Sequence, residues 1–249
     1  MEIHHNREDL SRFLVHLTRD DDDGERASAN LISILKDKTI FARNAHCLVM
    51  HKIKKMGFSD LLKSEFKTVC FTETPLTQIR QLVSEIKGRK IQLRPYGLVF
   101  WKDNLFDKGA SPAQYINAKG TSISKFLLDQ FDSIFEGITT LKKLKRVEVE
   151  HYENIVHYYS LINVVGDKND FLWEREWRHH GDFTFNYSDV VAIIANNPEG
   201  FEKWSEKKLG KTKHVYIKKI PIINPNWTYE ELLENFAINI WEKLSKEAS

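Results

Sequence analysis

Two glutamates, Glu174 and Glu176, stand two positions apart in the segment FLWEREWR (171–178). On a strand, side chains two positions apart point to the same face and lie about 7 Å apart. One carboxylate in such a pair can stabilise positive charge as it develops, and the other can accept a proton from a nucleophile. The alternative is a structural face, on which both glutamates and Arg178 form ion pairs with a neighbouring strand.

Two further apolar segments carry polar side chains. LVHLT (14–18) contains His16 and Thr18, and VCFTET (69–74) contains Thr72. Burying a polar group without a partner costs roughly 2–7 kcal/mol, so each of these groups needs a hydrogen bond, a water-filled cleft or a ligand. The structural alternatives are a satisfied core histidine at position 16 and simple strand propensity at Thr72.

The order of these segments resembles a known family. VHLT, ANLISILKDKTIFA, VCFTETPLTQIRQL, YGLVFWKDNLFDKGASPAQYI and WEREWR follow one another much as in the AbiGi-type abortive-infection proteins of bacteria. The resemblance spans about residues 12–195. It implies a role in phage resistance, as a toxin with a cognate antitoxin partner or as a non-catalytic antitoxin.

A more distant resemblance is to ADP-ribosyltransferases. That fold carries a polar residue on its first strand, Ser or Thr on a second strand and a glutamate on a later strand. The resemblance implies NAD as substrate, with Glu176 as the catalytic glutamate and Glu174 as its acceptor-side partner. It implies cofactor-binding roles for His16, Thr18 and Thr72. A ring that stacks on nicotinamide would be supplied by Phe71 or by Tyr115.

Two functions follow, from different classes. The first is an NAD-dependent ADP-ribosyltransferase effector, which transfers ADP-ribose to a nucleic acid or a protein. The alternative is a non-catalytic defence component, either an antitoxin or a protein-interaction module. The basic runs at 141–146 and 206–219 are either solvated faces or contacts to the phosphates of a nucleic-acid acceptor.

The composition sets outer bounds on these hypotheses. The chain has 249 residues, a net charge of +2 and 41% hydrophobic residues, which is typical of an ordered globular protein. Two cysteines provide no disulfide framework, so we expect a reducing, cytoplasmic environment. No metal-ligand motif and no apolar run of about 20 residues is present, so neither a metal centre nor a membrane span is expected.

The elements that must position these residues alternate without a regular β-α-β rhythm. This pattern favours a single α+β domain over 1–249, with a split, mixed or antiparallel sheet flanked by helices. We expect a closing helix over 228–246 that packs on the domain or on a partner. The expected strands lie at 12–18, 67–75, 96–102, 171–178, 189–195 and 213–220.

Overall fold

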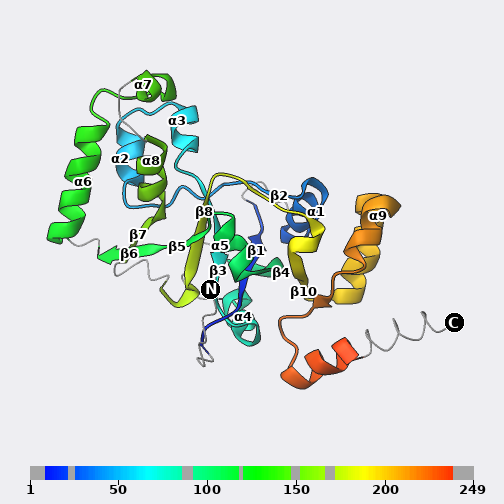
Figure 1. Ribbon diagram of the computed structural model, residues 1–249. Coiled ribbons are helices and arrows are strands. Elements are labelled where there is room, and N and C mark those ends of the chain that lie inside the picture. Colours follow the sequence, from blue (N-terminus) through cyan, green and yellow to red (C-terminus); the bar gives the residue numbers. More distant parts are fainter. Residues whose placement is uncertain are drawn as a thin grey trace. The chain divides into compact units, whose positions relative to one another are not determined.

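A computed structural model of the chain describes residues 9–21, 26–85, 92–117, 120–146, 152–165 and 172–237 (Figure 1). The chain forms two compact units, each assembled from segments that are distant in sequence. Unit 1 comprises Met1–Lys38, Glu73–Asn104 and Phe185–Ser249, and unit 2 comprises Thr39–Thr72 and Leu105–Thr184. Strands pair mostly antiparallel and helices flank them, which confirms the α+β class. The assignment of 1–249 to one domain stays a prediction.

Unit 1 contains three of the strands expected from the sequence. Its strand order is β11 (Ile222–Ile223), β10 (Val190–Ala195), β4 (Leu93–Trp101) and β1 (Phe13–Arg19). β4 pairs antiparallel with both β1 and β10, and β10 pairs parallel with β11. Leu98, Val99 and Phe100 are consecutive and fully buried. Such a run must be covered on both faces, as in strands at the centre of a sheet.

Helices supply that cover in unit 1. They are α1 (Ala27–Asp37), the 3-10 turn η1 (Leu76–Gln78), α4 (Ile79–Val83), the 3-10 turn η3 (Tyr187–Asp189) and α9 (Pro198–Ile217). Ile79 and Leu82 of α4 pack in one apolar cluster with Val15 and Leu17 of β1. Helix α1 contacts β1 and β4. β4 is followed by a short helix, α5 (Lys102–Asp107), within which the chain passes from unit 1 into unit 2.

The described residues of unit 2 form three small groups of paired strands. The order β3 (Thr68–Thr72), β8 (Glu176–His180), β5 (Ser111–Pro112) is antiparallel. β2 (Thr39–Ile40) pairs antiparallel with β9 (Phe183–Thr184). β6 (Gln114–Asn117) pairs parallel with β7 (Ile162–Val165) and places Tyr115 beside Asn163.

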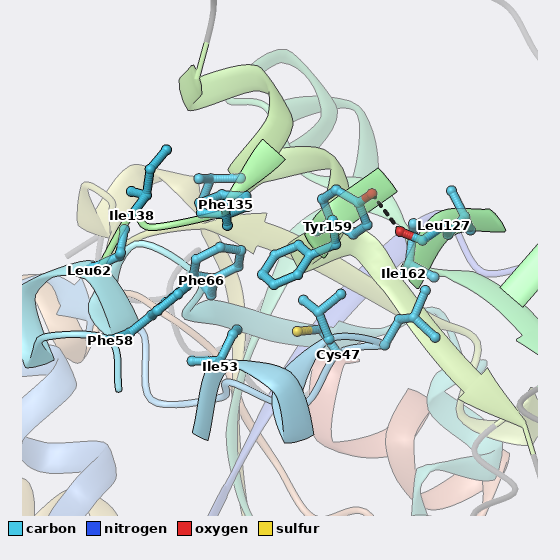
Figure 2. Close-up of a cluster of buried hydrophobic side chains, with 14 of the residues drawn as sticks. Cys47, Ile53, Phe58, Leu62, Phe66, Leu127, Phe135, Ile138, Tyr159 and Ile162 are labelled. Carbon is cyan, nitrogen blue, oxygen red and sulfur yellow. Dashed lines mark hydrogen bonds between the residues drawn. The ribbon is translucent and has the colours of Figure 1, made fainter. Parts of the chain in front are cut away.

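An aromatic core holds the helices of unit 2 together (Figure 2). These helices are α2 (Met50–Lys55), α3 (Asp60–Ser64), α6 (Ser122–Ile134), α7 (Leu141–Arg146) and α8 (Tyr152–Leu161). Leu127 and Phe131 are one helical turn apart on α6 and both are buried. The Phe131 and Phe135 rings stack with centroids 4.5 Å apart, and Tyr159 donates its hydroxyl to the Leu127 carbonyl at 2.8 Å. The amphipathic spacing of α6 therefore sets this core.

Near the C-terminal end of the described residues, one expected strand is absent and one expected helix is present at its start. The prediction of a strand at 213–220 is wrong, because α9 continues to Ile217 beyond a kink at Gly210, which has φ 75° and ψ 160°. His214 and Ile217 are buried three positions apart, a helical rather than an alternating spacing. Residues 229–237 are helical, in agreement with the start of the predicted closing helix, and 238–246 lie outside the described residues. None of the described helices combines the length and apolar character that crossing a bilayer requires.

Candidate functional site

Three of the predicted site residues lie together at one end of the β3–β8 pair in unit 2. Thr72 stands directly opposite Glu176 in the antiparallel register. The Thr72 hydroxyl donates to the backbone carbonyl of Glu174. Thr72 and Glu176 are both buried, whereas Glu174 is half-buried. The structure thus brings together Thr72, Glu174 and Glu176.

Glu174 does not share a strand face with Glu176, so that part of the prediction is wrong. Glu174 ends the 3-10 turn η2 (Leu172–Glu174), and β8 begins only at Glu176. Arg175 between them has a φ of 47°, in the left-handed region. The chain therefore turns between the two carboxylates, and the alternation of a strand does not relate them.

Glu176 does share a face with Arg178, and the two side chains form a buried ion pair. Arg178 Nε donates to Glu176 Oε1 at 3.0 Å, and the second guanidinium nitrogen Nη2 donates to Oε2 at 3.2 Å. Arg178 Nη1 donates to the Ser160 carbonyl at 2.6 Å. The exposed fraction is 1% for the Arg178 side chain and 9% for that of Glu176. A pair so buried holds its geometry, because an uncompensated charge there is costly.

Two neutral side chains from the β6–β7 pair also donate to Glu176. Tyr115 on β6 donates its hydroxyl to Oε2 at 2.8 Å, and Asn163 on β7 donates its amide to the same oxygen at 3.0 Å. Asn163 is in turn held by His46, whose Nδ1 lies 3.0 Å from Asn163 Oδ1. Asn163 is buried and Tyr115 is half-buried, so Tyr115 marks the more accessible side of the carboxylate.

This environment keeps the Glu176 carboxylate ionised. Burial alone would raise the pKa of Glu176, but the Arg178 charge and the hydrogen bonds from Arg178, Cys70 and Tyr115 outweigh burial and lower this pKa. Burial and the Glu176 charge raise the pKa of Tyr115, so its hydroxyl stays protonated and donates. Burial, followed by the Glu176 charge, raises the pKa of Cys70 to about 12, so its thiol is neutral. Glu176 and Arg178 are therefore a charged pair, and Tyr115 and Cys70 beside them are neutral.

The remaining predicted residues have other surroundings. Phe71 on β3 is buried, and its ring meets Phe183 edge-on at 5.3 Å between centroids. Thr18 lies in unit 1, where its buried hydroxyl is 2.9 Å from the Ala27 carbonyl and 3.0 Å from that of Tyr96. It thereby ties the start of α1 to the sheet. Hydrogen bonding of this kind is what a buried threonine requires.

His16 also lies in unit 1, on β1, and its side chain is half-buried. Its backbone runs very close to β4, where a Cβ added to Gly97 would lie 2.3 Å from the His16 carbonyl oxygen. Glycine is therefore required at position 97 for β1 and β4 to pair here. His16 faces away from the cluster formed by Val15 and Leu17, because adjacent strand residues point to opposite faces.

The residues that complete the cluster were missed at the sequence level. Asn163 and His46 lie in segments without a recognisable motif, and Tyr115 was considered only as a stacking ring. The sequence pattern places Arg178 on the same face as Glu176 but predicts ion pairs to a neighbouring strand, whereas the structure pairs these two residues with each other. Their spacing of two is the sequence signal for that pair.

An apolar hollow in unit 1 does not resemble a dinucleotide site. It is lined by side chains of η1, α4, β10, β11 and residues 224–232, among them Ile79, Ile194, Ile223 and Trp227. Among the described residues that line it, no Lys, Arg or His is present to meet phosphates. Across the described residues, no group of three or more His, Cys, Asp or Glu side chains is arranged to hold a metal ion.

Comparison with known proteins adds no family to this description. No protein-family model, curated protein or solved structure matches the chain. The geometry of the residues around Glu176 is therefore the basis for a functional proposal.

Proposed function

We propose that the chain is an ADP-ribosyltransferase effector that uses NAD as substrate and acts in bacterial anti-phage defence. The observation that supports the proposal is the ionised Glu176 carboxylate, which is held at the start of β8 opposite Thr72. Glu174 lies two positions earlier, at the end of η2. A fixed anion of this kind stabilises the positive charge that develops on a ribose as nicotinamide leaves.

The proposed step is a nucleophilic substitution at the ribose carbon C1′ of NAD. The bond from C1′ to the nicotinamide nitrogen breaks, and nicotinamide leaves with the electron pair. A nucleophilic atom of the acceptor bonds to C1′, and Glu174 takes the proton that this atom loses. Glu174 suits this role because it is half-buried, so that an acceptor can reach it.

A ribose hydroxyl reaches Glu176 by replacing a donor that is already present. The carboxylate accepts from Arg178, Tyr115 and Asn163, and the Cys70 thiol is a further donor, so the roughly four lone-pair positions of the carboxylate are all used. Tyr115 is the neutral donor on the accessible side, so it is the one that a substrate hydroxyl displaces. Arg178 and Asn163 remain in place and keep the carboxylate ionised.

The second candidate is a non-catalytic interaction module. It is favoured by the same hydrogen bonds to Glu176. Protein donors use all the acceptor positions of this carboxylate, as expected for an ion pair with a purely structural role. The two candidates differ in what they require of Glu174, which is not part of that pair.

The distinguishing experiment follows label transfer from NAD carrying the label in its ADP-ribose portion. Wild type, Glu174→Gln and Glu176→Gln are incubated with labelled NAD and bacterial lysate. A transferase labels a macromolecule, and nuclease or protease sensitivity identifies the acceptor class. We expect Glu174→Gln to retain the wild-type melting temperature and to lose about 100-fold or more in rate.

Glu176→Gln is included with a check of folding, because it leaves Arg178 without its counter-charge. Absence of labelling by folded wild type in every fraction contradicts the transferase proposal. Equal labelling by wild type and folded Glu174→Gln contradicts the role given to Glu174.

A further inference from the structure

The lysines of unit 1 are concentrated at the second half of α9 and the residues that follow it. Between 207 and 220 the sequence contains six lysines and no acidic residue, although the whole chain has a net charge of only +2. They are Lys207, Lys208, Lys211, Lys213, Lys218 and Lys219. All except Lys213 are exposed, and none forms an ion pair with a residue that the structure describes.

Two tyrosines accompany these lysines. Tyr216 on α9 is 54% exposed, and its ring stacks on Tyr187 with centroids 5.8 Å apart and an angle of 21° between the planes. Tyr187 is fixed by its hydroxyl, which donates to the Leu35 carbonyl at 2.8 Å. One face of the Tyr216 ring therefore packs on Tyr187, which is anchored to α1. The Tyr216 side chain remains exposed to solvent.

The fold positions this segment firmly against α1, which lies next to α9 in Figure 1. Lys213 Nζ donates to the Lys36 carbonyl at 2.7 Å. A further contact spans the kink at Gly210, because the buried His214 ring after the kink lies 3.3 Å from the Ser205 hydroxyl before it. Lys36 and Lys38, at the end of α1, add two exposed positive charges, with Asp37 as the acidic residue between them.

We propose that this basic tyrosine surface binds single-stranded nucleic acid. We define it as the six lysines between 207 and 219, Lys36, Lys38, Tyr187 and Tyr216. Exposed ammonium groups without carboxylate partners attract a phosphate backbone, and binding gains free energy as counterions are released. An exposed ring on a fixed support provides the stacking platform that single-strand binders use, and stacking is open to every base.

The composition of the surface argues for a nucleic acid over an acidic protein. All its cations are lysines, which act as point charges and suit a flexible phosphate backbone, whereas bidentate recognition of carboxylates favours arginine. An acidic protein has no requirement for an exposed tyrosine stack. The inference is independent of the proposed transferase chemistry, because binding is measured in the absence of NAD.

The test is fluorescence anisotropy of the full chain with labelled oligouridylate and oligodeoxythymidylate of about 12 nucleotides, near the site size of known single-strand binders. We expect a Kd in the micromolar range at physiological salt, as for electrostatic binding that does not read sequence. With three or four phosphates neutralised, raising salt from 50 to 200 mM weakens binding roughly 20- to 50-fold.

Matched variants distinguish the effect of this surface on binding from the effect of the net charge of the protein. Lys208→Glu/Lys211→Glu weakens binding about 10-fold or more, whereas Lys54→Glu/Lys55→Glu on α2 of unit 2, also exposed, changes it about 2-fold or less. Tyr216→Ala weakens binding about 5-fold or more, and Tyr216→Phe keeps wild-type affinity because the ring still stacks.

Binding of RNA, DNA or both supports the inference, and a preference between them identifies the sugar that is read. The inference is overturned if neither oligonucleotide binds, or if polyglutamate or anionic vesicles bind in their place. Equal weakening by the two lysine pairs, or wild-type binding by Tyr216→Ala, also overturns it.

Discussion

Charged side chains have opposite environments in two regions of the molecule, the Glu176–Arg178 pair in unit 2 and the basic tyrosine surface in unit 1. In the first, two opposite charges are buried and each is satisfied by several hydrogen bonds. In the second, lysines stand mostly in solvent, and none of them forms an ion pair with a residue that the structure describes. Changes to the buried pair must act first on the stability of the fold, and changes to the exposed surface must act on encounters with other molecules.

Removing one member of the buried pair has the largest expected effect. Arg178→Ala leaves the Glu176 carboxylate uncompensated and is expected to lower the free energy of unfolding by about 3–5 kcal/mol. Urea denaturation measures the change. Arg80→Ala, at an exposed arginine of α4, is the matched control and is expected to cost about 0.5 kcal/mol or less.

A double variant sharpens the interpretation of that loss. Glu176→Leu/Arg178→Leu removes both charges, so it is expected to cost less than Arg178→Ala alone. A double variant that is less stable than the single variant would show that the pair itself, and not the uncompensated charge, provides the stability.

The pH dependence of the free energy of unfolding also tests whether Glu176 is ionised in the buried pair. Because the pKa of Glu176 is lowered in the folded state, its contribution is fully present above the unfolded pKa of about 4.3 and is lost as pH falls through the folded pKa. We expect the stability difference between wild type and Glu176→Leu/Arg178→Leu to be constant from pH 7 to about 5 and to change in favour of the double variant below about pH 4. A difference that is constant down to pH 2 would contradict an ionised Glu176 with a lowered pKa.

Tyr115→Phe is expected to have an intermediate effect. It removes a hydrogen bond to an ionised carboxylate, which typically contributes about 1.5–3 kcal/mol. Tyr158→Phe, at a tyrosine that is 43% exposed in the same unit, provides the control and is expected to be nearly neutral. Thermal unfolding of the two variants measures the contrast. If Tyr115→Phe proves as stable as the control, the Tyr115 hydroxyl does not contribute to holding Glu176.

Charge reversal on the basic tyrosine surface has the smallest expected effect on stability. Lys208→Glu/Lys211→Glu is expected to change the free energy of unfolding by about 1 kcal/mol or less, because both side chains are exposed and form no ion pairs with described residues. Urea denaturation is performed on the same samples that are used for oligonucleotide binding. Unfolding of this variant would show that the lysines support the fold.

The sequence predicts some of these features and not others, for physical reasons. β1, β4 and β10 contain apolar runs bounded by polar residues. The local pattern of the sequence is enough to predict such strands. The turn between Glu174 and Glu176 rests on a left-handed arginine, and no glycine or asparagine at position 175 signals it. Tyr115 and Asn163 meet Glu176 through the parallel β6–β7 pairing, a contact between distant segments that periodicity cannot reveal.

The most direct test of the proposed chemistry measures nicotinamide release from NAD in bacterial lysate by folded wild type, Glu174→Gln and Lys208→Glu/Lys211→Glu, alongside oligonucleotide binding by the same three proteins. We expect Glu174→Gln to lose nicotinamide release about 100-fold or more while it binds oligonucleotide as wild type does. Lys208→Glu/Lys211→Glu should lose oligonucleotide binding about 10-fold or more. Nicotinamide release by wild type that does not exceed the lysate alone, or that Glu174→Gln leaves unchanged, would contradict the account.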